Sequence, residues 1–182
     1  MILNYFIKDI GVDLGTANTL IYVKGKGIVI NEPSIAAVNN KTNQVLAIGD
    51  EAKKMLGRAP SHISVIKPLI NGVISDFDMA TEMLNHHFKK IINNPIFSYQ
   101  RVVIGIPTNV TEVERKSVED AIISAGASKV YLLEEPVAAA LGARLPVNEP
   151  TSNMIVDIGG GTTEIAIISI GGNTLIRRGD SG

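Results

Sequence analysis

Two short stretches of the chain combine the residue types that can hold a phosphate and a metal ion together. The later one, residues 153–169 (NMIVDIGGGTTEIAIIS), runs from an apolar strand through three glycines into a second apolar strand. Asp157 ends the first strand, and Thr162 and Thr163 follow the glycines. Glycine lets backbone N–H groups approach a ligand closely, so this bend is typical of an anion-binding hairpin. An ordinary tight hairpin with glycines for turn geometry is the alternative interpretation.

The earlier stretch repeats this pattern near the start of the chain. V-D-L-G-T-A-N-T at residues 12–19 matches V-D-I-G-G-G-T-T at residues 156–163, so each strand ends in an aspartate before a glycine-containing bend. The repeat predicts two like domains that face each other across a cleft, with Asp13 and Asp157 at its two sides. Mg²⁺ prefers carboxylate and water oxygens, so the pair suits a nucleoside triphosphate with magnesium.

Glu135 is the candidate residue for hydrolysis. The sequence Glu134-Glu135-Pro136 follows an apolar strand pattern at residues 129–133 and opens a helix of small residues, since proline suits the first helical turn. A carboxylate there can orient the water that attacks a phosphate, or it can simply stabilise the positive end of the helix dipole. No lysine follows either hairpin at Walker spacing, which excludes a P-loop protein.

The segments between the two hairpins predict an α/β architecture. We expect one complete domain over residues 1–149, with a small inserted subdomain at about 32–65, and then at 150–182 the first strands of a second domain that the chain does not finish. The expected elements after the first hairpin are short strands and one small helix over 28–56, a long amphipathic helix over 76–93, a buried strand over 101–107, a capped helix over 112–125 and a strand over 129–133.

The composition excludes several classes of function. The 17 basic residues balance 18 acidic ones and form no stripe with aromatic residues, which argues against nucleic acid as a partner. The absence of cysteine excludes disulfides, thiolate zinc sites and cysteine nucleophiles. No apolar run is long enough to span a bilayer and the N-terminus lacks a signal-peptide pattern, so we expect a cytoplasmic protein.

Two histidines and two apolar segments have open interpretations. His86 and His87 are adjacent on a predicted helix, and no third ligand is expected near them, so we expect His87 to pack and His86 to face solvent rather than bind metal. Residues 1–7 (MILNYFI) and Ile96-Phe97 are unusually apolar for an end and a loop. Residues 1–7 either pack on the core or lie on a membrane surface, and the loop with Phe97 either packs on the core or contacts a membrane or a partner.

Several motifs lie within residues 10–170 of this chain. They are DLGTAN at 13–18, INEPS at 30–34, VIGIPTNVTEVERK at 103–116, EEPVAAALGA at 134–143 and DIGGGTTEIAIIS at 157–169. In combination they resemble the MreB family of bacterial actin homologues. DnaK-type chaperones of the same superfamily have GTTN where this chain has GTAN, and NEPTAAALAYG where it has EEPVAAALGA.

The resemblance implies an actin-like (ribonuclease H-like) ATPase whose hydrolysis of Mg-ATP controls filament assembly, with GTP as the alternative nucleotide. It implies self-association into antiparallel protofilament pairs, with filament contacts at residues 32–65 and helix 112–125. It also implies a location at the inner face of the cytoplasmic membrane, through residues 1–7 and Ile96-Phe97, and partners among cell-wall synthesis and shape proteins. The filaments would thereby control rod cell shape and cell-wall synthesis.

A non-polymerising enzyme or chaperone of the same superfamily, and a binding module without catalysis, remain the alternative functions.

The resemblance also assigns roles to individual residues. The implied first phosphate loop is Gly15, Thr16, Ala17 and Asn18, and the implied second is Gly159, Gly160, Gly161 and Thr162. Asp13 and Asp157 would lie on the magnesium side, with Asp157 also facing the nucleotide. Glu135 and Thr162 would position the attacking water.

Overall fold

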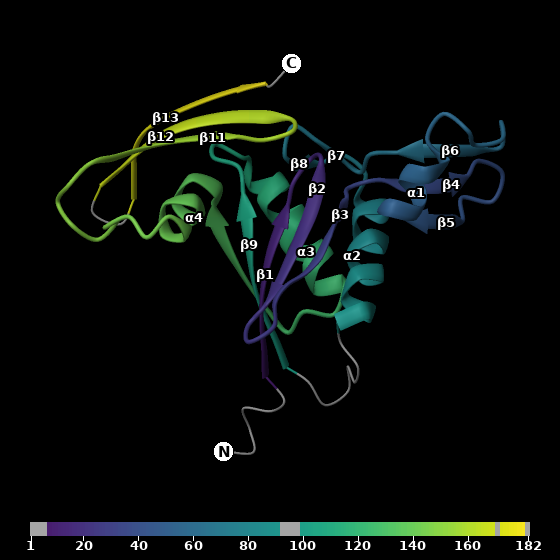
Figure 1. The fold of residues 1–182 in the computed structure, drawn as a ribbon, viewed down its shortest axis with the longest axis horizontal. Coiled ribbons are helices and arrows are strands. Elements are labelled where there is room, and N and C mark those ends of the chain that lie inside the picture. Colours follow the sequence, from purple (N-terminus) through teal and green to yellow (C-terminus); the bar gives the residue numbers. More distant parts are fainter. Residues whose placement is uncertain (1–6, 92–98, 170–171, 181–182) are drawn as a thin grey trace.

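A mixed five-stranded sheet forms the centre of the protein in the computed structural model, which describes residues 7–91, 99–169 and 172–180 (Figure 1). Its strand order is β10-β9-β1-β2-β3. β1 runs parallel to β9 and β9 parallel to β10, whereas β2 is antiparallel to both of its neighbours. The strands are β1 (Ile7–Leu14), β2 (Asn18–Val23), β3 (Gly27–Pro33), β9 (Tyr99–Ile106) and β10 (Lys129–Glu134).

One face of this sheet makes the main hydrophobic core. Alternate residues of the strands, such as Val12, Ile21 and Ile104, are buried, as the two-residue period of a strand requires. Helices α2 (Phe77–Ile91) and α3 (Glu112–Ser124) pack on this face, and Phe88 and Ile122 are buried in the same cluster.

Helix α3 begins with the capping box that the sequence predicts. The Thr111 hydroxyl accepts a hydrogen bond from the Glu114 N–H (3.2 Å), and the Glu114 carboxylate accepts one from the Thr111 N–H (2.7 Å). Two otherwise unpaired N–H groups are thereby satisfied. Gly126, with φ of 108°, follows the last turn, so both predicted ends of this helix are confirmed within two residues.

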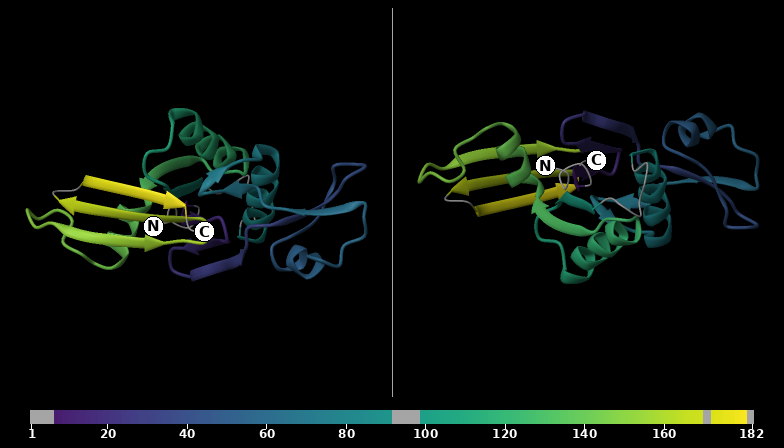
Figure 2. Two further views of the ribbon diagram at one scale, coloured as in Figure 1. Left: turned by 90° about the horizontal axis from the view of Figure 1, so that it is seen from above. Right: turned by 90° about the horizontal axis from the view of Figure 1, so that it is seen from below.

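A smaller sheet projects to one side of the main sheet (Figures 1 and 2). It spans residues 36–66, against the range of about 32–65 predicted for the inserted subdomain, and has a small core of its own, which includes Ile35, Ala37 and Ala52. A two-stranded hairpin, β7 (Leu69–Ile70) and β8 (Val73–Ile74), then leads the chain to α2. The sheet, in the order β5-β4-β6, consists of β4 (Ala36–Asn39), β5 (Val45–Ile48) and β6 (Ile63–Ile66), with α1 (Asp50–Met55) beside it.

A three-stranded antiparallel sheet follows α4 (Glu135–Gly142) and lies across the end of the main sheet (Figure 1). Glu164 of β12 is 1% exposed, and its Oε1 accepts hydrogen bonds from the N–H and the hydroxyl of Thr108, both at 3.0 Å. Thr108 lies just after β9, so this buried carboxylate joins the two sheets. The strands are β11 (Asn153–Ile158), β12 (Thr162–Ser169) and β13 (Gly172–Asp180).

Most of the two apolar segments falls outside the described residues. This applies to residues 1–6 and to Ile96-Phe97, whereas Ile7 begins β1 and pairs with Tyr99 at the start of β9. The two segments therefore connect to neighbouring strands at the same end of the sheet. No helix in the described part of the chain is long and apolar enough to cross a membrane.

Candidate functional site

The two glycine-containing hairpins meet at a cleft of about 370 Å³ between the main sheet and the three-stranded sheet. The first hairpin joins β1 to β2, and the second joins β11 to β12. All the residues that sequence and resemblance single out for nucleotide, metal and water line this one cleft. They are Asp13, Gly15, Thr16, Ala17, Asn18, Glu135, Asp157, Gly159, Gly160, Gly161 and Thr162.

The glycines of the second hairpin allow it to touch the first. A Cβ atom on Gly160 would overlap the methyl group of Ala17, and one on Gly161 would lie 2.7 Å from the Thr16 hydroxyl oxygen. Neither glycine has a positive φ, so close approach rather than backbone conformation is what requires glycine here. The two hairpins therefore form one continuous loop surface on the cleft.

Two residues that sequence reasoning missed hold the first hairpin in place. Ser34 donates through its hydroxyl to the carbonyl oxygen of Gly15 (2.6 Å) and through its N–H to that of Ala17 (3.0 Å). Gly72, in the turn between β7 and β8, donates its N–H to the Thr16 hydroxyl (2.8 Å). Because Thr16 accepts this bond, its own O–H proton can still be donated to a ligand. The Asn71-Gly72 pair is a turn signal, but nothing in the sequence says what that turn contacts.

The two aspartates lie close enough to repel each other. Although the Asp13 carboxyl is open to the cleft, the surrounding protein removes part of its hydration, and the Asp157 carboxylate adds repulsion. Both effects raise the pKa of Asp13, with the loss of hydration the larger. A divalent cation would remove the repulsion, and two carboxylates beside hydroxyl groups are the oxygen donors that Mg²⁺ prefers. The residues present therefore fit a magnesium ion.

Glu135 reaches the cleft from the first residue of α4. It lies beside Gly105 of β9, where a Cβ atom would come within 3.3 Å of the Glu135 Cγ. Ala138 and Ala139, on the next turn of α4, also line the cleft, and their small side chains leave space in front of the carboxylate. Thr162 is 8% exposed on the opposite sheet. An acid from the start of α4 and a hydroxyl from the three-stranded sheet thus share one cavity.

The structure corrects one expectation outside the cleft. His87 is fully buried, which confirms that it packs, but His86 is only partly exposed. The prediction that no third metal-ligand type lies near them is wrong, because the Glu32 carboxylate of β3 lies beside both imidazoles. Glu32 and the two histidines are more than fifty positions apart in the chain, so sequence spacing could not reveal this group.

Comparison with known protein families decides the family. The family model described as "MreB/Mbl protein" matches residues 7–178. The chain belongs to the MreB/Mbl family. Curated relatives agree: the chain is 52% identical over 166 residues to the cell shape-determining protein Mbl of Bacillus subtilis, and 49% identical over 172 residues to the cell shape-determining protein MreB of Escherichia coli K12.

The chain spans about half the length of these MreB and Mbl relatives. The match to Bacillus subtilis Mbl covers 91% of this chain and 50% of the relative, and the match to Escherichia coli MreB covers 92% and 50%. The family assignment therefore rests on nearly all of this chain, while the comparison reaches only part of each relative.

Solved structures confirm the predicted α/β, actin-like fold. MreB5 of Spiroplasma citri, solved with bound ADP, superposes with a TM-score of 0.86 at 42% identity, over 94% of this chain and 51% of that one. The MamK double helical filament superposes with a TM-score of 0.76 at 23% identity, over 96% of this chain and 54% of that one. The MamK likeness concerns the fold alone.

Replacing one cleft aspartate tests the electrostatics of the site. Asp13→Asn should raise the melting temperature of the metal-free protein at neutral pH, because it removes a partly desolvated charge that faces Asp157. Because the pKa of Asp13 is raised in the native state, the wild type loses stability as the pH rises from the ordinary value of 3.8 through the raised pKa. The gain in melting temperature of Asp13→Asn over the wild type should therefore grow with pH over this range.

With magnesium and nucleotide bound, the wild type should instead melt at a higher temperature than Asp13→Asn. Asp13→Asn should bind the Mg-nucleotide at least about tenfold more weakly, because it lacks one carboxylate toward the ion. Differential scanning fluorimetry across pH, with and without Mg-ATP, measures both effects. A variant that melts below the wild type in metal-free buffer at neutral pH would contradict this account of the site.

Proposed function

We propose that this chain is part of an actin-like ATPase that binds Mg-ATP in the cleft between its two hairpins. The observation that carries the proposal is that all eleven predicted site residues line the same cavity. MreB5 of Spiroplasma citri, 42% identical to this chain, has been solved with ADP and with AMPPNP, which supports an adenine nucleotide over GTP. In this proposal, Asp13 and Asp157 hold the magnesium ion, and the two hairpins bind the phosphates.

The proposed hydrolysis assigns separate tasks to Glu135 and Thr162. The Glu135 carboxylate accepts a hydrogen bond from the attacking water and orients it toward the terminal phosphate, with Thr162 on the opposite side. Backbone N–H groups of the hairpins would stabilise the charge that develops on the phosphate oxygens, and a Mg²⁺ ion held by Asp13 and Asp157 would supply further positive charge there. The cleft has room for a water molecule in front of Glu135 because Gly105, Ala138 and Ala139 are small.

We further propose that the protein assembles into filaments that control rod cell shape. The names of the MreB and Mbl relatives, cell shape-determining proteins, support this. Helix α3 carries two exposed apolar residues, Val113 at 76% and Ile123 at 46%, among charged ones, as expected of a contact surface. The inserted range at 32–65 would supply further filament contacts, and residues 1–149 and 150–182 would be the first domain and the start of the second.

A place at the inner face of the cytoplasmic membrane is the last part of the proposal. Residues 1–6 and 92–98 connect to β1 and β9, whose first residues pair with each other. Asp13 is six positions after Ile7, a distance of about 20 Å at the rise of an extended strand. Membrane contact through residues 1–7 and Ile96-Phe97 would therefore leave the cleft open to the cytoplasm and the filament near cell-wall synthesis and shape proteins.

The catalytic role of Glu135 has a direct test. Glu135→Ala should slow phosphate release by about a hundredfold or more, since a positioned general base contributes at least that much, and should leave nucleotide affinity nearly unchanged. The neighbouring Glu134→Ala is the matched control, because Glu134 precedes the helix and does not line the cleft. Lost binding with unchanged hydrolysis per bound nucleotide would argue against this role.

Filament formation has its test on α3. Val113→Glu should raise the critical concentration for sedimentation with Mg-ATP by about tenfold or more, because assembly would bury an unpaired charge. The residue is 76% exposed, so melting temperature and nucleotide affinity should stay at wild-type values. Leu141→Glu, at an exposed apolar position of α4, is the control. If the wild type itself has no critical concentration, a non-polymerising enzyme of the superfamily is the better assignment.

Membrane binding can be measured by flotation with liposomes that contain anionic lipid. A variant that lacks residues 1–7 and carries Phe97→Ser should float at least about fivefold less than the wild type, because it loses most of its apolar membrane-facing area. Each change alone shows which segment dominates. Equal flotation of all variants would reject both segments as membrane contacts.

A further inference from the structure

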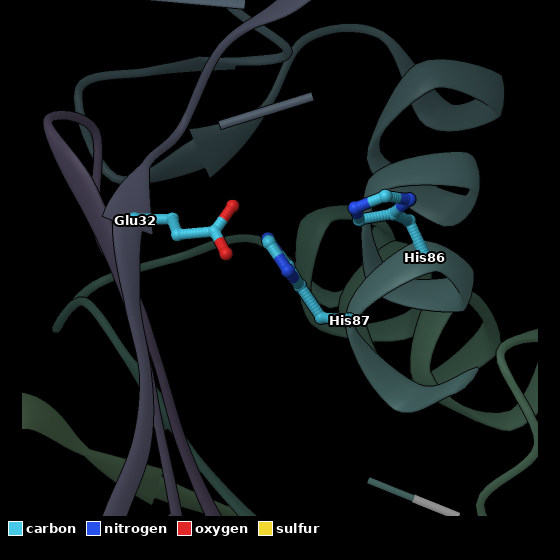
Figure 3. A group of neighbouring side chains, drawn as sticks. All are labelled: Glu32, His86 and His87. Atoms are coloured by element: carbon cyan, nitrogen blue, oxygen red, sulfur yellow. The ribbon is translucent and has the colours of Figure 1, made fainter. Parts of the chain in front are cut away.

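We propose that Glu32, His86 and His87 form a binding site for a divalent transition-metal ion such as Zn²⁺, separate from the nucleotide cleft. Glu32 extends from β3 toward α2, and both imidazoles lie on the side of α2 that faces it (Figure 3). One carboxylate oxygen and one nitrogen from each ring all lie within 4.8 Å of one another. Two histidines, one carboxylate and an open position form a common coordination of Zn²⁺.

The spacing of the three ligand atoms suits an ion after small side-chain rotations. Atoms bound at about 2.1 Å to one tetrahedral ion lie about 3.4 Å apart. The two imidazole rings are 5.6 Å apart at their centroids and inclined by 72°, so their nitrogens can approach one point from different directions. Adjacent helical residues normally diverge, but a strand that crosses in front of the helix provides a shared target.

His87 gives the strongest reason to expect a ligand. The side chain is fully buried, and neither Nδ1 nor Nε2 has a hydrogen-bond partner. A buried polar group without a partner costs free energy, and a native structure usually satisfies it. Burial lowers the pKa of His87 to about 4, so the ring is neutral at physiological pH and has a lone pair for a metal.

The surroundings of Glu32 supply negative charge and a fixed position. A Cβ atom on Gly49 would overlap the Glu32 carboxylate, so the glycine leaves room for it. The groove beside it is lined by the carboxylates of Glu32, Asp50 and Glu51 and by the ammonium group of Lys90, and Lys54 is paired with Glu51. Lys90 is paired with Glu32 Oε1 at 2.8 Å and Oε2 lies against Gly49, so an ion would compete with Lys90 for this carboxylate. The partly exposed lysine can turn toward solvent when an ion binds.

An ion at this place would join β3 to α2. Glu32 is two residues from Ser34, which donates its hydroxyl hydrogen bond to the carbonyl of Gly15 in the first hairpin. Fixing Glu32 would therefore also restrict the strand that holds this hairpin. Binding of the ion would stabilise the fold even in the absence of nucleotide.

Cobalt is the probe that tests the site. The full chain is titrated with Co²⁺ in excess Mg²⁺, which occupies carboxylate sites, since imidazole ligands favour Co²⁺ and Zn²⁺ over Mg²⁺. We expect one Co²⁺ per chain, with visible absorption bands that Zn²⁺ abolishes, and a rise in melting temperature. Glu32→Gln, His86→Ala and His87→Gln should each weaken Co²⁺ binding at least about tenfold.

His62→Ala is the matched control, because His62 is the remaining histidine and is exposed outside the cluster. It should bind Co²⁺ as the wild type does. If His87→Gln does not fold, as shown by circular dichroism, Glu32→Gln and His86→Ala decide, since neither replaces a fully buried side chain. Unsaturable Co²⁺ binding, wild-type affinity in these variants, or an equal loss in His62→Ala would overturn the proposal.

Discussion

The contact between the two glycine-containing hairpins is the constraint on which the rest of the structure depends. Gly160 and Gly161 lie so close to Ala17 and Thr16 that a side chain on either glycine would overlap the first hairpin. The main sheet presents Asp13 at the end of β1, and the three-stranded sheet presents Asp157 at the end of β11. Because both carboxylates enter one cleft, the fold accepts a repulsion that a bound cation would relieve.

Buried polar contacts maintain this arrangement from outside the cleft. Glu164 accepts two hydrogen bonds from Thr108 and thereby holds β12 against the loop after β9. Ser34 and Gly72 hold the first hairpin from the side of the small sheet and the β7–β8 turn. Such bonds have a direction as well as an energy, so they set the position of each hairpin more closely than apolar packing could.

Local patterns in the sequence predicted the elements that depend on near neighbours. Thr111 and Glu114 are three residues apart, so their capping box follows from spacing alone, and the structure has it. The amphipathic helix α2 and the buried strand β9 are equally local patterns. The group formed by Glu32, His86 and His87 was not predictable, because its members come from a strand and a helix whose approach depends on the whole domain.

The sequence by itself determined the two aspartate-glycine hairpins, the acid at the start of α4 and the likeness to the MreB family, because each is written in consecutive residues. Only the tertiary structure decided that all these residues line a single cleft, that Thr16 is held by Gly72, and that a carboxylate faces the paired histidines. The physical reason is the same in each case. Such contacts join residues far apart in the chain, and packing of whole sheets and helices, rather than local spacing, brings them together.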